Sequence, residues 1–256
     1  MSKIKITIIT ITYNSAKTVR ETFESVRSQK YENLEYLLID GGSQDGTLSI
    51  AEEYSDIITK VVSEPDEGIS DAMNKGIRLA TGDLIGIIHS DDALTDGALD
   101  RLASMWDGKT DVYYGDAIIM NESGKPTHVL CGKEDLSGLP YGFCLVHPAT
   151  FVSRAAYERY GVFDKQYKCA MDYELLLRFY KGGAAFRYIH ENLAYFRSGG
   201  TNERYRQRTL DEVCEISIRH GGNRLKAHML KFKKKMADQV RPLIGNMIRN
   251  KRVQKL

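Results

Sequence analysis

The sequence predicts an α/β fold in which a mostly parallel central sheet is flanked by helices. Short apolar, β-branched runs alternate with segments of helical periodicity, and the links between them are short. The chain of 256 residues is also long enough to bury a sizeable core. Because strands that alternate with helices are joined most economically by right-handed crossovers, these observations together favour parallel pairing.

The first hundred residues show this alternation most clearly. Ile4–Thr12 is an apolar and β-branched run typical of a strand that is buried on both faces. We expect a helix to begin near Ala16, because Val19, Phe23 and Val26 follow at helical spacing. The other elements expected in this half are strands at Glu35–Ile39, Ile57–Ser63 and Leu84–Ile88 and helices from Thr47 and at Ile69–Ala80.

The pattern is looser after Asp92. Helices are expected at Ala98–Trp106, Ala155–Tyr160 and Tyr173–Lys181, and strands at Val112–Tyr114, Ala117–Met120, Ala149–Val152 and Phe186–Ile189. We expect the body of the protein to be one domain over residues 1–205, and residues 206–256 to form a helical, basic and peripheral C-terminal extension.

Charge is distributed unevenly along the chain. From Arg219 onward there are 12 Lys and Arg residues and a single acid, Asp238, whereas the preceding residues carry 24 basic and 33 acidic side chains. A basic tail on an acidic body indicates that the tail meets an anionic partner.

The cysteines and the N-terminus indicate the compartment. The four cysteines are far apart in the sequence and form no Cys-x-x-Cys pair, which is typical of idle thiols in a reducing environment. Lys3 and Lys5 interrupt the N-terminal apolar stretch, so we expect a strand there and no signal peptide. No apolar run approaches the ~20 residues that a membrane-spanning helix requires. These features together predict a cytoplasmic protein.

Polar segments follow the predicted strands of the first half. In an open α/β sheet, ligands bind beyond the carboxyl ends of the strands, so these segments are expected to meet at one edge. Asp91 and Asp92 there are candidate oxygen ligands for a hard cation, although paired acids also cap helices. The glycine-rich loop after Asp40 has a plain tight turn as its alternative. The converging segments are Thr12-Tyr13-Asn14, Asp40-Gly41-Gly42-Ser43, Glu64-Pro65-Asp66-Glu67-Gly68 and Ser90-Asp91-Asp92.

The order and spacing of these motifs resemble those of family 2 glycosyltransferases. The resemblance also includes Ala80-Thr81-Gly82-Asp83, His147-Pro148-Ala149-Thr150-Phe151 and Met171-Asp172-Tyr173-Glu174, and so extends over most of the chain. It implies the GT-A fold, a nucleotide-diphosphate sugar donor, Mg²⁺ or Mn²⁺, and inversion at the anomeric carbon. It also implies a nucleotide-binding half at 1–100 and an acceptor half at 101–205.

The resemblance assigns donor-binding roles to particular residues. It implies that Thr12, Tyr13 and Asn14 surround the nucleoside, that Asp40 accepts from a uracil ring, and that Asp66 belongs to a loop that closes over the donor. It further implies that Ser90 and Asp91 contact the donor and that Asp91 and Asp92 hold the metal.

One position departs from the family pattern, because His89 replaces the first acid of the metal and ribose motif. A neutral imidazole there either donates to a ribose hydroxyl or packs beneath the nucleotide.

Candidate residues of the second half follow from the same resemblance. Asp172 is the predicted catalytic base, with the N-cap of the Tyr173–Lys181 helix as its alternative role. His147 is either a structural histidine or a contact to donor or acceptor. Arg197 is a candidate phosphate ligand. Glu174 and Arg178 lie four residues apart, where an intrahelical ion pair is the expected role.

The basic tail has an amphipathic pattern. Leu243, Ile244, Met247 and Ile248 fall at spacings of one, three and four between basic residues, which is typical of a helix lying on an anionic membrane. A solvated or oligomer-forming helix is the alternative. We expect no nucleic acid partner, because no recognition motif accompanies the charge.

These observations predict an enzyme that transfers a hexose or N-acetylhexosamine from a nucleotide sugar, UDP favoured, to a lipid-linked saccharide during polysaccharide biosynthesis. It would act as a peripheral protein on the inner face of the plasma membrane. The alternative is a catalytically degenerate nucleotide-sugar-binding protein, which only His89 favours. A nucleotidyltransferase or a dehydrogenase is disfavoured, because neither a basic glycine-rich loop nor Gly-x-Gly-x-x-Gly follows the first strand.

Overall fold

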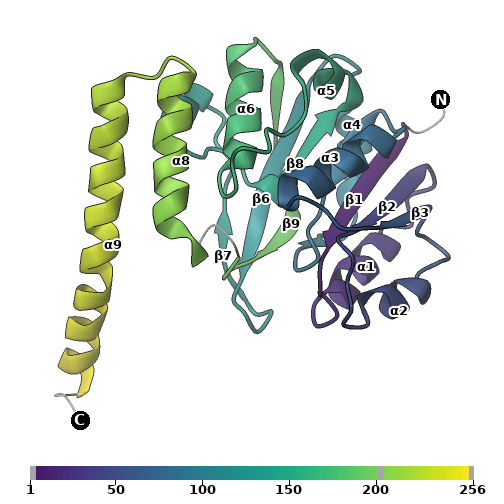
Figure 1. The fold of residues 1–256 in the computed structure, drawn as a ribbon, viewed down its shortest axis with the longest axis horizontal. Helices are drawn as coiled ribbons and strands as arrows, with labels where there is room; N and C mark the ends of the chain where they lie inside the picture. The colour runs from purple at the N-terminus through teal and green to yellow at the C-terminus, as the bar shows by residue number, and fades with distance from the viewer. Residues whose placement is uncertain (1–3, 201–203, 254–256) are drawn as a thin grey trace.

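The computed structural model describes residues 4–200 and 204–253, with side chains described as far as residue 239. Its centre is one mixed sheet with helices on both faces (Figure 1). The sheet order is β3-β2-β1-β4-β8-β6-β9-β5, and β7 pairs with β6 outside this path. The predicted α/β fold is therefore confirmed.

The first half forms the parallel part of the sheet. Strand β1 pairs in parallel with β2 and β4, and β2 pairs in parallel with β3. Neighbouring residues of β1 face opposite sides of the sheet, so Ile8 packs in one hydrophobic cluster and Ile9 in the other. The elements of this half are β1 (Ile6–Thr12), α1 (Val19–Arg27), β2 (Leu34–Asp40), α2 (Thr47–Glu52), β3 (Lys60–Ser63), α3 (Ile69–Leu79) and β4 (Leu84–Ile87).

The second half extends the sheet with mixed pairing. Strand β8 lies antiparallel between β4 and β6, and β9 runs parallel to β6. The remaining elements are β5 (Ala93–Leu94), α4 (Ala98–Met105), β6 (Val112–Met120), β7 (Pro126–Leu130), the 3-10 turns η1 (Leu136–Tyr141) and η2 (His147–Ala149), β8 (Thr150–Ser153), α5 (Arg154–Tyr160), α6 (Met171–Lys181), β9 (Phe186–Arg197), α8 (Arg206–Arg219) and α9 (Arg224–Val253).

Three expectations about the elements were wrong in detail. Ile57 and Ile58 lie in a turn, where their amides donate to the Tyr54 carbonyl, so β3 starts only at Lys60. The two strands expected between Val112 and Met120 are one irregular strand, and β9 continues far beyond Ile189 to Arg197.

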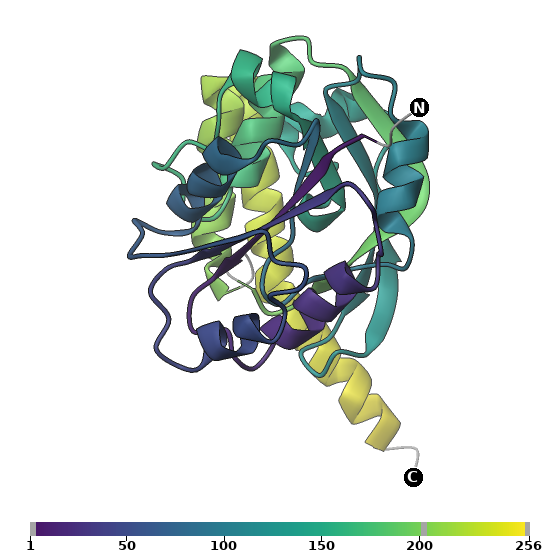
Figure 2. The ribbon, with the colours of Figure 1, turned by 90° about the vertical axis from the view of Figure 1, so that its right-hand side faces the viewer.

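Helix α8 is not peripheral, contrary to expectation. Val213 and Ile216 belong to the same buried cluster as α3 and α6, and the Ser217 hydroxyl donates to the Pro140 carbonyl at 2.5 Å. Figure 1 shows α8 between the body and α9, while Figure 2 shows the far part of α9 extending away from the body. The domain boundary at residue 205 stays a prediction.

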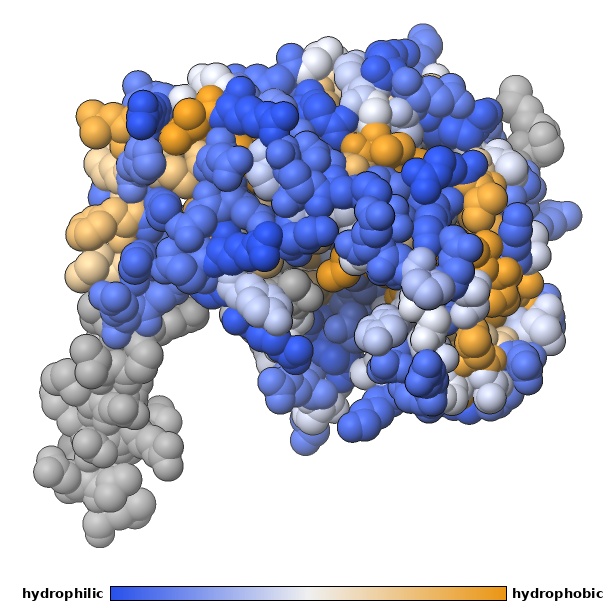
Figure 3. Space-filling model, viewed as in Figure 1, coloured by the Kyte–Doolittle hydropathy of each residue, from blue (hydrophilic) through white to orange (hydrophobic). Residues whose placement is uncertain are grey.

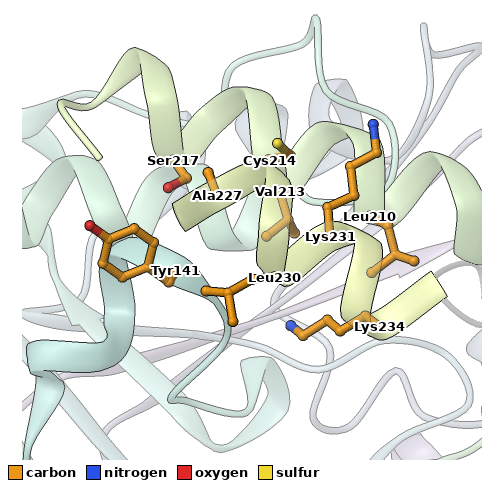
Figure 4. A pocket seen from close by; sticks show the side chains of 9 residues that line it. All are labelled: Tyr141, Leu210, Val213, Cys214, Ser217, Ala227, Leu230, Lys231 and Lys234. Carbon is orange, nitrogen blue, oxygen red and sulfur yellow. The ribbon is translucent and has the colours of Figure 1, made fainter. Parts of the chain in front are cut away.

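Helix α9 packs on α8 through its first turns. Figure 4 shows Ala227 of α9 beside Ser217 of α8 at one end of this seam, near Tyr141, and Leu210 of α8 at the other end. Within the described part of the chain, no helix is both long and apolar enough to span a bilayer.

Candidate active site

The carboxyl ends of the parallel strands place the predicted donor residues together. Thr12 ends β1 and Asp40 ends β2, and the register makes the two direct neighbours. The Thr12 hydroxyl donates to Asp40 Oδ1 at 2.8 Å. The convergence that the strand ends predict is therefore confirmed for these two segments.

Asp40 shapes the loop that follows it. The residue is 1% exposed, and its carboxylate accepts from the Gly42 and Ser43 amides at 3.0 and 2.9 Å and from the Ser43 and Ser63 hydroxyls at 2.5 and 2.7 Å. Burial alone would raise the pKa of Asp40, but the hydrogen bonds from Ser43, Ser63 and Thr12 hold it below its usual value. The carboxylate is thus an ionised acceptor, and a uracil N–H would have to share it with these donors.

The loop after β1 is fastened to the loop after β2. Asn14 has a φ of 48°, its amide donates to Ser43 Oγ at 2.8 Å, and its Oδ1 accepts from the Gln44 amide at 2.9 Å. These contacts leave Tyr13 at the surface with 66% of its area exposed. An exposed aromatic ring held on a tied loop is suited to stacking against a nucleobase.

The segment containing Asp66 joins the same edge. A Cβ atom at Gly41 would lie 2.6 Å from Asp66 Oδ2 and 3.3 Å from Tyr13 Cδ2, so a side chain at this position would displace the Asp66 carboxylate. Asp66 also accepts from the Gly68 amide at 2.7 Å through its Oδ1. Tyr13, Gly41 and Asp66 therefore surround one point on the surface.

The Ser90-Asp91-Asp92 segment separates its two carboxylates. Asp91 is partly exposed, whereas Asp92 is 3% exposed and accepts from the Arg197 amide at 3.0 Å. Burial, together with the neighbouring Asp91 charge, raises the pKa of Asp92 well above its usual value. Ser90 donates to Ser15 Oγ at 2.8 Å and so connects this segment to the loop after β1.

Arg197 clamps this segment from β9. Its Nε donates to the Asp91 carbonyl at 3.2 Å and its Nη1 to the Glu122 carbonyl at 3.1 Å, while Nη2 pairs with Glu21. The guanidinium is thus already occupied by protein partners. To contact a phosphate, as predicted, it would have to exchange one of them.

His89 packs against His147. The two rings meet edge to face with centroids 5.2 Å apart, and His147 also lies 6.1 Å from the ring of Phe163. Burial lowers the pKa of His89, although the Asp91 charge opposes the shift. Burial and the neighbouring His89 lower the pKa of His147 to about 3. Both imidazoles are therefore neutral at pH 7. The sequence alone did not indicate that the two histidines are in contact.

Asp172 lies in the first turn of α6, and it is not the N-cap. The N-cap is Ala170, so the capping alternative for Asp172 was wrong. The residue as a whole is partly exposed, but its carboxyl group is buried. Burial raises the pKa of Asp172 to about 6; the hydrogen bond from the Tyr173 amide at 2.8 Å opposes the shift, and the Glu212 charge adds to it. A carboxyl with a pKa near 6 is well suited to act as a general base.

The segment that precedes Asp172 contacts the Asp66 loop. Lys168 Nζ donates to the Glu67 carbonyl at 3.3 Å. Lys165 Nζ contacts Glu67 Oε2 at 2.7 Å and Asp71 Oδ1 at 3.3 Å. The two halves of the molecule therefore meet at the loop predicted to close over the donor. The expected ion pair within α6 is also confirmed, since Arg178 Nε lies 2.9 Å from Glu174 Oε1.

The chemistry of these residues fits a divalent cation whose coordination shell is completed by phosphate oxygens of the substrate. No group of three His, Cys, Asp or Glu that could hold a metal is found in the described ranges. Mg²⁺ is usually bound by one or two carboxylates together with substrate phosphates, and the partly exposed Asp91 is the available carboxylate. Burial and the repulsion from Asp91 together raise the pKa of Asp92, and a cation beside Asp91 would offset that repulsion.

Sequence reasoning missed the residues that support this edge. Ser63, Glu21 and Glu122 hold Asp40 and Arg197 in place, and each lies far from its partner in the sequence. The Thr81-Gly82-Asp83 motif, by contrast, has a structural role at the opposite end of β4. There the Gly82 amide donates to Thr7 Oγ1 at 2.9 Å, and Asp83 accepts from the Lys5 amide at 3.0 Å.

Comparison with known proteins identifies the family of the chain. The family model of glycosyl transferase family 2 matches residues 7–198, so the chain belongs to this family. A PGL/p-HBAD biosynthesis glycosyltransferase of Mycobacterium tuberculosis is 29% identical over 200 residues, which cover 75% of this chain and 77% of that protein.

Solved structures show the same fold. TarS 1-349 of S. aureus in complex with UDP-GlcNAc aligns with a TM-score of 0.68 and 18% identity, covering 89% of this chain and 70% of that one. The mannosyltransferase PcManGT from Pyrobaculum calidifontis, in complex with GDP-Man and Mn²⁺, aligns with a TM-score of 0.67 and 17% identity, covering 91% and 70%. The chain spans 42% of the longer TarS chain. The protein is thus a glycosyltransferase with the GT-A fold.

Proposed function

We propose that this glycosyltransferase moves a hexose or N-acetylhexosamine from a nucleotide-diphosphate sugar to a lipid-linked saccharide, with inversion at the anomeric carbon. One observation carries the proposal. The segment that leads to Asp172, a carboxyl with a raised pKa, touches the Asp66 loop beside Tyr13 and Gly41. A proton acceptor thus belongs to the segment that borders the candidate donor site.

The proposed reaction assigns a separate task to each half. Thr12, Tyr13, Asn14 and Asp40 bind or shape the pocket for the nucleoside. Asp172 takes the proton of the acceptor hydroxyl as its oxygen attacks the anomeric carbon from the face opposite the leaving diphosphate. A bound Mg²⁺ or Mn²⁺ at Asp91, with Asp92 behind it, would offset the charge that develops on that diphosphate.

The nucleotide and the metal are inferred from the relatives. UDP is favoured because the ionised Asp40 is an acceptor for a uracil N–H and because the TarS structure holds UDP-GlcNAc. A divalent cation is favoured because PcManGT was solved with Mn²⁺. His89 takes the place of an acid beside this site, and as a neutral ring it either donates to the ribose or packs beneath it.

A panel of nucleotide sugars tests this part of the proposal. UDP-, GDP- and dTDP-sugars are each added with Mn²⁺, Mg²⁺ or EDTA, and the thermal midpoint is measured, since a ligand that binds only the folded state raises it. We expect a metal-dependent rise with UDP-sugars that is lost in Asp91→Ala and retained in the exposed control Asp96→Ala. A folded protein that no nucleotide sugar stabilises would contradict the proposal.

We further propose that α9 lies on an anionic membrane at the cytoplasmic face, where a lipid-linked acceptor is found. Leu225, Met229, Phe232 and Met236 are exposed at spacings of four, three and four residues. Figure 3 shows hydrophobic surface on this side of the molecule. Exposed Lys226, Lys233 and Lys235 accompany the stripe. The side chains of Leu243, Ile244, Met247 and Ile248, which suggested this role, lie outside the described residues.

Vesicle sedimentation tests the membrane proposal. We expect binding to vesicles that contain phosphatidylglycerol, weak binding to pure phosphatidylcholine, and loss of binding in Phe232→Ser with Met236→Ser. Equal binding by this double variant, or a concentration-dependent dimer that the same substitutions abolish, would contradict it.

The alternative function is a nucleotide-sugar-binding protein without catalysis, which the histidine at position 89 favours. The two candidates differ in their response to Asp172→Asn. That substitution changes nothing measurable in a binding protein, whereas it removes turnover from a transferase.

A further inference from the structure

Glu212 is a buried carboxylate that the candidate active site does not directly include. It lies on α8, outside the region from 7 to 198 that the family model matches, and it is 7% exposed. A carboxylate is rarely buried to this degree unless it is paired or hydrogen-bonded.

The partners of Glu212 are three consecutive backbone amides just before α6. Its Oε2 accepts from the Cys169 amide at 2.8 Å and the Ala170 amide at 2.9 Å, and the Lys168 amide lies 3.1 Å from Oε1. Successive amides that point at one anion form a nest, which fixes the backbone conformation of all three residues.

Glu212 is ionised in this nest. Arg208, one turn earlier on α8, donates from Nε to Glu212 Oε1 at 2.8 Å. Burial alone would raise the pKa of Glu212, but the hydrogen bonds from Arg208 and the three amides hold it below its usual value. Hydrogen bonds to a charged acceptor are stronger than neutral ones.

The three amides lie in the segment that runs from the residue in contact with the donor loop to the proposed base. Ala170 is the N-cap of α6, and its methyl side chain offers no acceptor to cap the helix. Asp172 follows two residues later. On the other side, Lys168 contacts the Glu67 carbonyl of the donor loop. The carboxylate on α8 therefore holds a segment that connects the donor loop to the proposed base.

We propose that Glu212 is a positioning residue for Asp172: it anchors residues 168–170 so that the proposed base and the donor loop keep a fixed relation. This role rests on the function proposed above. It also makes α8 necessary for catalysis, since without this helix the segment that positions Asp172 would lose its anchor.

Variants at residue 212 test the role, with Glu215→Ala as the matched control because Glu215 is exposed on the same helix. Two readouts are combined: amide hydrogen exchange of the peptide containing residues 168–170, and the kcat and KM of donor turnover. We expect Glu212→Ala to speed exchange by about 10-fold to 100-fold and to lower kcat by about 10-fold to 100-fold, with the donor KM nearly unchanged.

Glu212→Gln keeps the shape of the side chain and serves if Glu212→Ala does not fold. It should lower kcat less than Glu212→Ala. It should also move the acid limb of the kcat profile to lower pH, because the negative charge beside Asp172 is gone.

Unchanged exchange and unchanged kcat in a folded Glu212 variant would overturn the positioning role. Equal turnover by the wild-type protein and Asp172→Asn would instead contradict the proposed base, so the two failures can be told apart.

Discussion

The two halves of this glycosyltransferase are built by different means. In the first half, parallel strands β1, β2 and β4 end at one edge, and each polar segment there follows directly from its own strand. In the second half, Asp172 depends on contacts from far along the chain, since Glu212 on α8 holds the approach to α6. The segments of the donor edge are thus placed by the strands that they follow, with Arg197 of β9 clamping one of them, whereas the proposed base is placed by tertiary contacts alone.

This difference indicates where each half is vulnerable. Several residues with different proposed tasks meet at the donor edge, whereas the proposed base is a single carboxylate. The substitutions below separate these cases, beginning with the largest expected effect.

Asp172→Asn should lower turnover by about 10²-fold to 10⁴-fold, because the amide cannot take the proton of the attacking hydroxyl. Release of the nucleoside diphosphate from a donor sugar measures this effect. Asp164→Asn, in the loop that precedes α6, is the control and should retain turnover within a small factor. Comparable rates for Asp172→Asn and the wild type would exclude Asp172 as the base.

Asn74→Ala should weaken the junction of the two halves. Asn74 is 4% exposed, its Nδ2 donates to the Phe163 carbonyl at 2.8 Å, and its Oδ1 accepts from the Phe163 amide at 2.9 Å. Because the substitution leaves buried backbone groups unpaired, we expect a loss of about 2–3 kcal/mol in the free energy of unfolding. Urea denaturation measures it, and Arg78→Ala on the exposed face of α3 should have little effect. Equal stability of both variants would contradict the junction.

Glu35→Gln should destabilise the frame of the first half by about 1–3 kcal/mol near neutral pH. Glu35 accepts from Thr7 Oγ1 at 2.6 Å, the Thr81 amide at 2.7 Å and Lys5 Nζ at 3.1 Å. Burial opposes ionisation, but these hydrogen bonds lower the pKa of Glu35 from 4.5 to about 2.

The pH dependence of this contribution follows from the sign of the shift. A lowered folded-state pKa gives a stabilisation that is present above pH 4.5 and is lost as the pH falls from 4.5 towards 2. Denaturation at pH 7 and pH 3 should therefore show a smaller difference between wild type and Glu35→Gln at the lower pH. A difference that grows on acidification would contradict this account.

The smallest expected effect is the pH dependence of the wild-type enzyme. The base must be deprotonated, and burial raises the pKa of Asp172 to about 6. The kcat should therefore rise with pH through about 6 and level off above it, as measured by turnover at saturating donor. A profile that is flat from pH 5 to 8 would show that a group other than Asp172 limits the reaction.

Much of the first half could be predicted from the sequence. The apolar runs of β1, β2 and β4 have a clear signal, and the buried residues Val19, Phe23 and Val26 of α1 follow helical spacing. Asp40, Asp66 and Asp91 were accordingly placed on one edge from strand ends alone. The exception is β3, an edge strand with mostly exposed residues, where the apolar pair Ile57 and Ile58 belongs to a turn.

The second half could be predicted only in part. The helix of Asp172 was expected, but its start at Met171 was not, since the segment before it is held by Glu212 from α8. Glu212 lies between the apolar residues Leu210 and Val213, and an acid on the apolar face of a helix was the one signal that it is buried and paired. The His89–His147 contact and the clamp made by Arg197 join segments whose sequence separation exceeds what local patterns can indicate.

The division of labour between the halves is tested most directly by calorimetric titration of a UDP-sugar with Mn²⁺ into three proteins: wild type, Asp91→Ala and Asp172→Asn. We expect Asp172→Asn to bind the donor as tightly as wild type while its turnover is lost, and Asp91→Ala to lose the metal-dependent part of the affinity. Equal loss of donor affinity in both variants, or intact affinity in Asp91→Ala, would contradict the assignment of donor binding to the first half and of the base to the second.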